Sequence, residues 1–103
     1  MNIFYTDHSY IEAAKIVADL SVYCESGIFT VESKNFETLK KSTVDLRNRH
    51  AQHYYMHVEI EFVENNKSKV SIYNLLNNSQ TKQQAIVIES WLNNKSTECV
   101  PRF

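Results

Sequence analysis

The chain has 103 residues, of which 43% are hydrophobic and 22% are charged, and its formal net charge is −1. This length gives one domain with one core, the composition is that of a globular protein, and the charge argues against an acidic mimic of DNA. The chain has a single glycine, which argues against the glycine-rich loops that bind phosphate.

The N-terminal third predicts a strand, a helix and a second strand. The run "NIFY" near the N-terminus is typical of a short buried strand. In "SYIEAAKIVADLSVYCES", apolar residues recur at helical spacing, Ser9 and Glu12 occupy capping-box positions, and Gly27 follows as a C-cap. The segment "IFTVE", residues 28–32, alternates as a strand does.

The next segment, 36–50, fits either a helix or a strand, because its apolar spacing is helical while "STVDL" is also typical of a strand. The run "YYMHVEIEFVE" predicts a strand whose two faces differ. Met56, Val58, Ile60 and Phe62 point one way, and the opposite face carries Tyr55, His57, Glu59 and Glu61. A turn at "NNKS" predicts a hairpin with "KVSIYNLL", and "SQTKQQAIVIESWLNN" predicts a final helix.

These elements predict a small α+β fold in the order β-α-β-(α or β)-β-β-α. We expect a mostly antiparallel sheet of three to four strands with two to three helices packed on one face. The predicted domain covers residues 1–96, and residues 97–103 form a loosely attached tail.

The two cysteines, Cys24 and Cys99, are too few and too far apart to predict a disulfide framework or a zinc knuckle. We therefore expect two reduced thiols and a cytoplasmic protein. No apolar run is as long as a membrane span, and the N-terminus lacks the pattern of a signal peptide.

Residues 47–64, "RNRHAQHYYMHVEIEFVE", concentrate candidate functional side chains. His50, His53 and His57 would align on a helix, but this stretch includes the most regular predicted strand. On a strand, His53 and His57 are about 13 Å apart, too far for one zinc ion to bind both. We therefore expect no metal and no other cofactor.

The leading hypothesis is a non-catalytic protein-binding module of unknown oligomeric state that covers a partner's surface. Small phage or mobile-element inhibitors, anti-CRISPR proteins and toxin-immunity proteins share its size and general style. Tyrosine, histidine and arginine lining a polar sheet face are typical of binding hot spots. The predicted contact residues are Arg47, Arg49, His53, Tyr55, His57, Glu59 and Glu61.

Two alternatives use overlapping residues. The basic and aromatic segment 40–55 could bind nucleic acid, with cations on phosphates and a tyrosine stacked on a base. Its residues would be Lys40, Lys41, Arg47, Arg49 and Tyr54. A metal-assisted hydrolase or nuclease around His53, His57 and Glu59 is the second alternative, although no nucleophile motif accompanies them.

Overall fold

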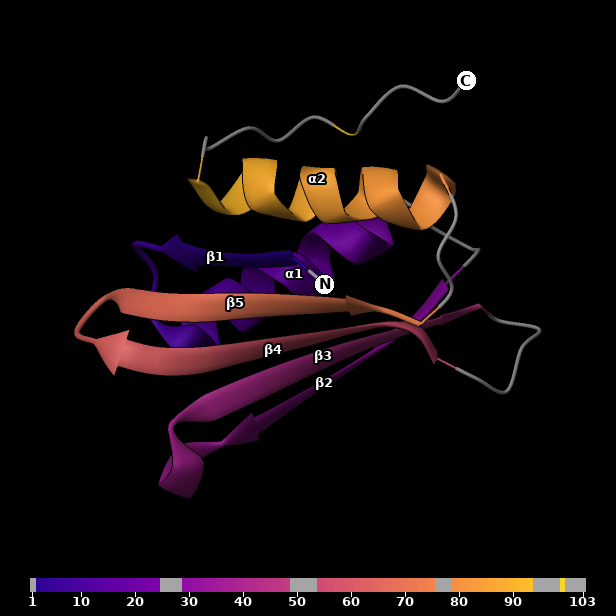
Figure 1. Ribbon diagram of the computed structural model, residues 1–103. Helices are drawn as coiled ribbons and strands as arrows, with labels where there is room; N and C mark the ends of the chain where they lie inside the picture. Colours follow the sequence, from indigo (N-terminus) through magenta and orange to yellow (C-terminus); the bar gives the residue numbers. More distant parts are fainter. Residues whose placement is uncertain (1, 25–28, 49–53, 76–78, 94–98, 100–103) are drawn as a thin grey trace.

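An antiparallel sheet and two helices make up the fold (Figure 1). The computed structural model describes residues 2–24, 29–48, 54–75, 79–93 and 99. The elements in chain order are β1 (Asn2–Thr6), α1 (Tyr10–Cys24), β2 (Phe29–Phe36), the short 3-10 helix η1 (Glu37–Leu39), β3 (Lys41–Asn48), β4 (Tyr54–Glu64), β5 (Lys67–Asn74) and α2 (Ser79–Asn93). Within these residues the five strands form one sheet in the order β1-β5-β4-β3-β2, and all neighbours are antiparallel.

The predicted α+β class and element order are confirmed, and the ambiguous segment 36–50 is mostly strand. The sheet therefore has five strands, one more than the upper end of the expected range. Residues of β3 alternate between the two faces of the sheet, as a strand requires. Ser42, Val44 and Leu46 are fully buried on one face, while the residues between them lie on the other. The chain turns back from β2 through η1, where Lys40 adopts a left-handed backbone conformation with φ 50°.

Helix α1 begins as its sequence predicts. The Glu12 N–H donates to Ser9 Oγ at 3.1 Å, and the Ala13 N–H donates to the Ser9 carbonyl at 2.8 Å, so Ser9 is the N-cap. The Glu12 carboxylate contacts His8 Nδ1 at 3.1 Å. Gly27, the predicted C-cap, lies outside the described residues.

The core lies between the helices and one face of the sheet. Its buried residues are Ala13, Ala14, Val17 and Leu20 of α1, Val44, Leu46, Met56, Val58, Ile60, Val70 and Ile72 of the sheet, and Ala85, Val87, Ile88 and Leu92 of α2. The alternation predicted for β4 is thus confirmed from Met56 to Ile60. Phe62 is 38% exposed, because it sits at the strand end where the β4–β5 pairing shifts register.

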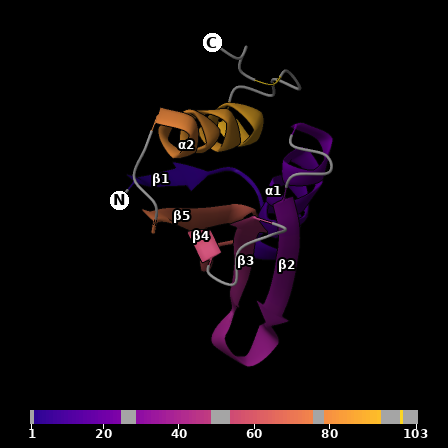
Figure 2. The ribbon, with the colours of Figure 1, turned by 90° about the vertical axis from the view of Figure 1, so that its right-hand side faces the viewer.

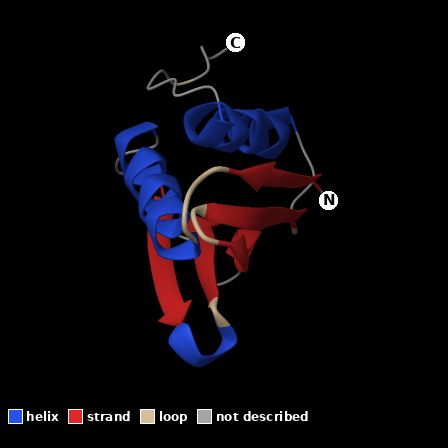
Figure 3. Ribbon diagram, turned by 90° about the vertical axis from the view of Figure 1, so that its left-hand side faces the viewer, coloured by secondary structure: helices blue, strands red, loops and turns tan. Residues whose placement is uncertain are grey.

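Both helices cover the same face of the sheet (Figures 2 and 3). Helix α1 packs across β2, β3 and β4, and α2 lies beside α1 at the β1 end. In the described part of the chain no helix covers the opposite face, which we call the open face. Among the described residues, no helix combines the length and the hydrophobicity needed to cross a membrane.

The prediction of two free thiols is wrong, because Cys24 and Cys99 form a disulfide with their Cα atoms 5.6 Å apart. They are 75 residues apart in sequence. Helices α1 and α2 pack against each other, and the bond joins the last residue of α1 to Cys99, which follows α2 in sequence. Separation along the sequence was therefore a poor guide to separation in space. The disulfide attaches Cys99, within the predicted tail, covalently to α1.

Candidate functional site

The strand register arranges the open face in rows that cross the sheet. One row contains Phe36, Lys41, Glu61, Lys69 and Tyr5, each paired with the next on the neighbouring strand. The next two rows are Lys34, Thr43, Glu59, Ser71 and Ile3, and then Glu32, Asp45, His57 and Tyr73. Directly opposite side chains on neighbouring strands lie close enough to interact, so each row is a chain of adjacent side chains.

The centre of the open face holds four connected side chains, Asp45, His57, Glu59 and Lys41, which we call the His57 cluster. The Asp45 carboxylate contacts His57 Nδ1 across the β3–β4 pair. His57 Nε2 lies 3.1 Å from Glu59 Oε1, and Lys41 Nζ lies 3.4 Å from the same oxygen. Donation by both ring nitrogens to carboxylates requires the protonated imidazolium, because neutral histidine has only one N–H.

Partial burial and charge have opposing effects on His57. Burial lowers the pKa of His57, but the hydrogen bonds to Asp45 and Glu59 and the charges of both carboxylates outweigh it, so the pKa is raised above 6.5. The hydrogen bond from His57, aided by Lys41, lowers the pKa of Glu59 below 4.5 despite partial burial. The cluster therefore favours a cationic His57 between two carboxylates.

Aromatic and apolar side chains border this polar centre. Ile3 and Tyr5 on β1 are 49% and 54% exposed, and Phe36 on β2 is 40% exposed. The Tyr73 ring centroid lies 5.8 Å from that of His57. The open face thus has a charged centre with apolar residues on both outer strands.

Not all of the predicted contact residues can be placed. Register and alternation put Arg47, His57, Glu59 and Glu61 together on the open face. Arg49 and His53 lie outside the described residues, as does the side chain of Tyr55. The structure adds Tyr73 and Lys69 from β5, the predicted hairpin partner of β4. It also adds Asp45 and Thr43 from β3, whose pairing with β4 could not be read from the sequence.

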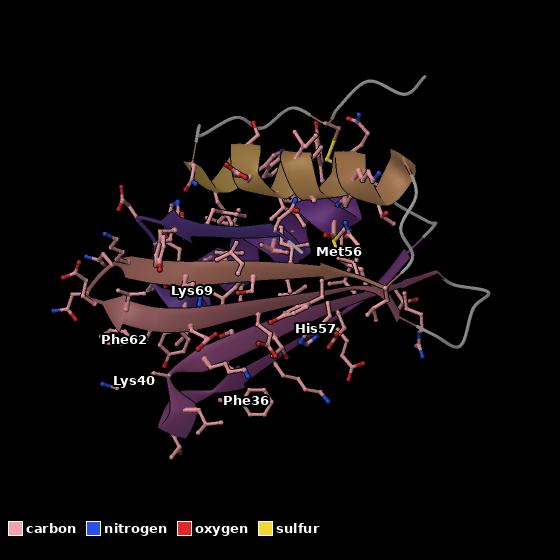
Figure 4. All side chains as sticks on the ribbon, viewed as in Figure 1. Phe36, Lys40, Met56, His57, Phe62 and Lys69 are labelled. Carbon is pink, nitrogen blue, oxygen red and sulfur yellow. A yellow bond between two sulfur atoms is a disulfide. The ribbon has the colours of Figure 1, made fainter. Side chains whose placement is uncertain are left out.

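Those residues of the nucleic-acid hypothesis that the structure describes do not form one uniform basic surface. Lys40 lies at the end of the sheet with its Nζ 4.7 Å from the centre of the Phe62 ring (Figure 4). Lys41 contacts Glu59, and Arg47 is half-buried two residues from Asp45 on the same strand face. Arg49 and the Tyr54 side chain lie outside the described residues.

The hydrolase hypothesis joined His53 to His57 and Glu59. The last two do lie on one strand face within hydrogen-bond distance, while His53, like His50, lies outside the described residues. Among the residues that the structure describes, no three His, Cys, Asp or Glu side chains are arranged to hold a metal ion. Within the cluster, the carboxylates of Asp45 and Glu59 contact the His57 ring itself.

Comparison with known proteins gives no further guide. No protein-family model, curated protein or solved structure matches this chain.

Proposed function

We propose that this protein is a non-catalytic binding module that recognises another protein with the open face of its sheet. The observation that carries the proposal is that both helices lie on one face, while the other is uncovered among the described residues and carries exposed apolar side chains. The contact would centre on His57, Glu59 and Glu61, with Tyr73 and Arg47 beside them. The module would act by covering its partner's surface, as stoichiometric inhibitors and immunity proteins do.

The distribution of side chains supports a protein partner. Tyrosine and arginine are frequent hot-spot residues, and a contact is strongest where they are desolvated at the centre of an interface. Here the central charges already neutralise one another through Asp45, His57, Glu59 and Lys41. A paired cluster is cheaper to desolvate than an isolated charge, so it suits burial under a partner.

The same pairing weighs against nucleic acid as the partner. Binding to nucleic acid depends on cations that neutralise phosphates and release counterions. On the open face, Lys41 lies beside Glu59, and Lys69 is paired in register with Glu61. A phosphate backbone laid across these rows would meet carboxylates as often as cations.

The sequence predicts a cytoplasmic protein on two grounds, the free thiols and an N-terminus without a signal-peptide pattern. The Cys24–Cys99 disulfide removes the first ground, because disulfides persist in oxidising compartments and are rare in the cytosol. We therefore propose that the module meets its partner in an oxidising compartment.

The test is affinity capture from the native host, followed by reconstitution with the purified partner and calorimetric titration. Tyr73→Ala and His57→Ala should each weaken the complex by roughly thirtyfold, since truncating a hot-spot residue costs about 2 kcal/mol or more. Lys15→Ala, at an exposed position on α1, is the matched control and should bind as the wild type does.

Melting curves separate lost contacts from lost folding. The open-face variants should lower the melting temperature by less than about 8 °C, since the His57 cluster contributes about 1 kcal/mol or less. Ile60→Ala should destabilise the fold by roughly 2–5 kcal/mol because Ile60 is fully buried. The proposal fails if the captured partner is nucleic acid released by moderate salt. It also fails if Lys15→Ala weakens a protein complex as much as Tyr73→Ala does.

A further inference from the structure

The two edge strands of the sheet, β1 and β2, differ in their contacts with the described residues. At the β1 edge, Asn93 Nδ2 of α2 donates to the Tyr5 carbonyl at 3.0 Å, and the Thr6 hydroxyl donates to the Leu92 carbonyl at 3.3 Å. Helix α2 therefore satisfies polar groups of β1. At the opposite edge, β2 is the outermost strand, and within the described residues no strand pairs beyond it (Figure 2).

The charges on β2 alternate in a way that suits pairing with a second copy. Glu32 and Lys34 both lie on the open face, and their side chains are 43% and 58% exposed. They contact each other along the strand, with Lys34 Nζ 3.4 Å from Glu32 Oε1. Because they flank Ser33 symmetrically, a two-fold axis at Ser33 would bring Glu32 of each copy opposite Lys34 of the other.

We propose that β2 pairs antiparallel with β2 of a second copy of this chain, in the register that places Ser33 opposite Ser33. The two sheets would then join into one continuous sheet, with the open faces of both copies on the same side. A two-fold contact of this kind uses the same surface of both subunits, which is the commonest way for a protein to form a dimer.

Charge and side-chain alternation together select this register. If the pairing register shifted by one residue, open-face residues of one copy would lie opposite core-face residues of the other, which strand alternation forbids. Moving the two-fold axis by one residue shifts the register by two and keeps the faces matched. Moving the axis to Glu32 would place two glutamates opposite each other, and moving it to Lys34 would do the same with two lysines. Like charges directly opposite are destabilising, and opposite charges are favourable. The Ser33 register is thus the two-fold pairing that makes two favourable ion pairs.

The remaining positions are compatible with this register. On the open face, Phe36 of one copy would lie opposite Thr30 of the other, which would cover part of a ring that is 40% exposed. On the core side, the half-buried Val31 would lie opposite Asn35. A lysine on an edge strand ordinarily opposes edge-to-edge pairing. Here the glutamate two residues earlier supplies its partner, so the edge accepts its own copy.

The contact is formed by one strand of eight residues, so it is smaller than a standard interface and should be weak. We therefore expect a reversible dimer with a Kd in the micromolar to roughly millimolar range. Sedimentation equilibrium on the oxidised full-length chain, up to about 1 mM, covers this range. The dimer should weaken as salt is raised, because the ion pairs are close to solvent.

Charge reversal provides the decisive variants. Glu32→Lys alone places lysine opposite lysine at both pairs, and Lys34→Glu alone places glutamate opposite glutamate. Each should weaken the dimer about tenfold or more. The double variant Glu32→Lys with Lys34→Glu restores opposite charges in the same register and should dimerise as the wild type does. A mixture of the two single variants should form mixed dimers for the same reason.

Lys82→Glu is the matched control, since Lys82 is exposed on α2 and away from β2, and it should leave dimerisation unchanged. Circular dichroism of every variant checks that the fold is intact. A wild-type chain that stays monomeric at about 1 mM overturns the proposal. So does a dimer that ignores the single reversals, or a double variant that fails to regain the wild-type affinity.

Discussion

The disulfide predicts how strongly the fold depends on a covalent link. Cys99→Ala removes the link at the end that lies beyond α2, and it leaves Cys24, which packs partly against the core, in place. In the chain-entropy account, a cross-link stabilises the native state by restricting the unfolded chain, more so for longer loops. With a sequence separation of 75 residues, this restriction is worth about 4.5 kcal/mol at 25 °C.

Measured losses on removing a native disulfide from a small domain are typically about 2–5 kcal/mol, so the chain-entropy figure lies within the observed range. For a domain of about 100 residues, each kcal/mol corresponds to about 4–8 °C in Tm. We therefore expect Cys99→Ala to lower Tm by roughly 10–40 °C. Urea unfolding, followed by tryptophan fluorescence, should report the same loss as a lower midpoint.

Reduction of the wild type is the matched control. In the presence of dithiothreitol, the wild type and Cys99→Ala should melt at nearly the same temperature, because both then lack the cross-link. Thiol titration of the denatured, oxidised wild type should find no free thiol. Two reactive thiols in that titration, or a wild-type Tm that does not respond to reductant, would refute the reasoning.

Two further predictions concern pH and a turn. The pKa of His57 is raised on folding, so His57 stabilises the fold fully below about pH 6.5, and this stabilisation is lost as pH rises through the raised pKa. The pKa of Glu59 is lowered on folding, so Glu59 stabilises the fold fully above about pH 4.5, and this stabilisation is lost as pH falls through the lowered pKa. The melting temperature should therefore be constant between these pH values. Above them, the stability should fall by about 1 kcal/mol or less as His57 loses its proton, and Asp45→Asn should make this fall smaller. Asn66, between β4 and β5, has φ 57°, so Asn66→Ala should cost about 1 kcal/mol while Asn66→Gly is nearly neutral, and equal melting temperatures for both variants would contradict this.

Local patterns were sufficient to predict most of the fold. The Ser9 cap, the apolar face of α1 and the alternation of β4 each depend on neighbours in sequence, and each is found in the structure. Segment 36–50 was ambiguous because the spacing of Phe36, Leu39, Thr43 and Leu46 fits a helix as well. Pairing with β2 and β4 makes it a strand, and such pairing has no local signal.

In the candidate site, too, contacts within one strand were predictable from the sequence and contacts between distant segments were not. His57 and Glu59 are two residues apart on one strand, so the sequence predicts their shared face and the structure places them 3.1 Å apart. Asp45, the second carboxylate on His57, comes from another strand and required the β3–β4 register. The Cys24–Cys99 bond was missed for a similar reason, since it depends on how two helices pack.

The strand order also has a consequence for the route by which the chain folds. β2, β3, β4 and β5 are neighbours both in the sheet and in sequence, so their pairing closes only short segments. β1 instead pairs with β5, and Thr6 meets Ser68 only after most of the chain has been brought together. Closing a longer segment costs more conformational entropy before any contact is gained, and contacts distant in sequence slow folding. The pairing of β1 is therefore kinetically the most demanding in the sheet, although β1 precedes every other described strand in the sequence.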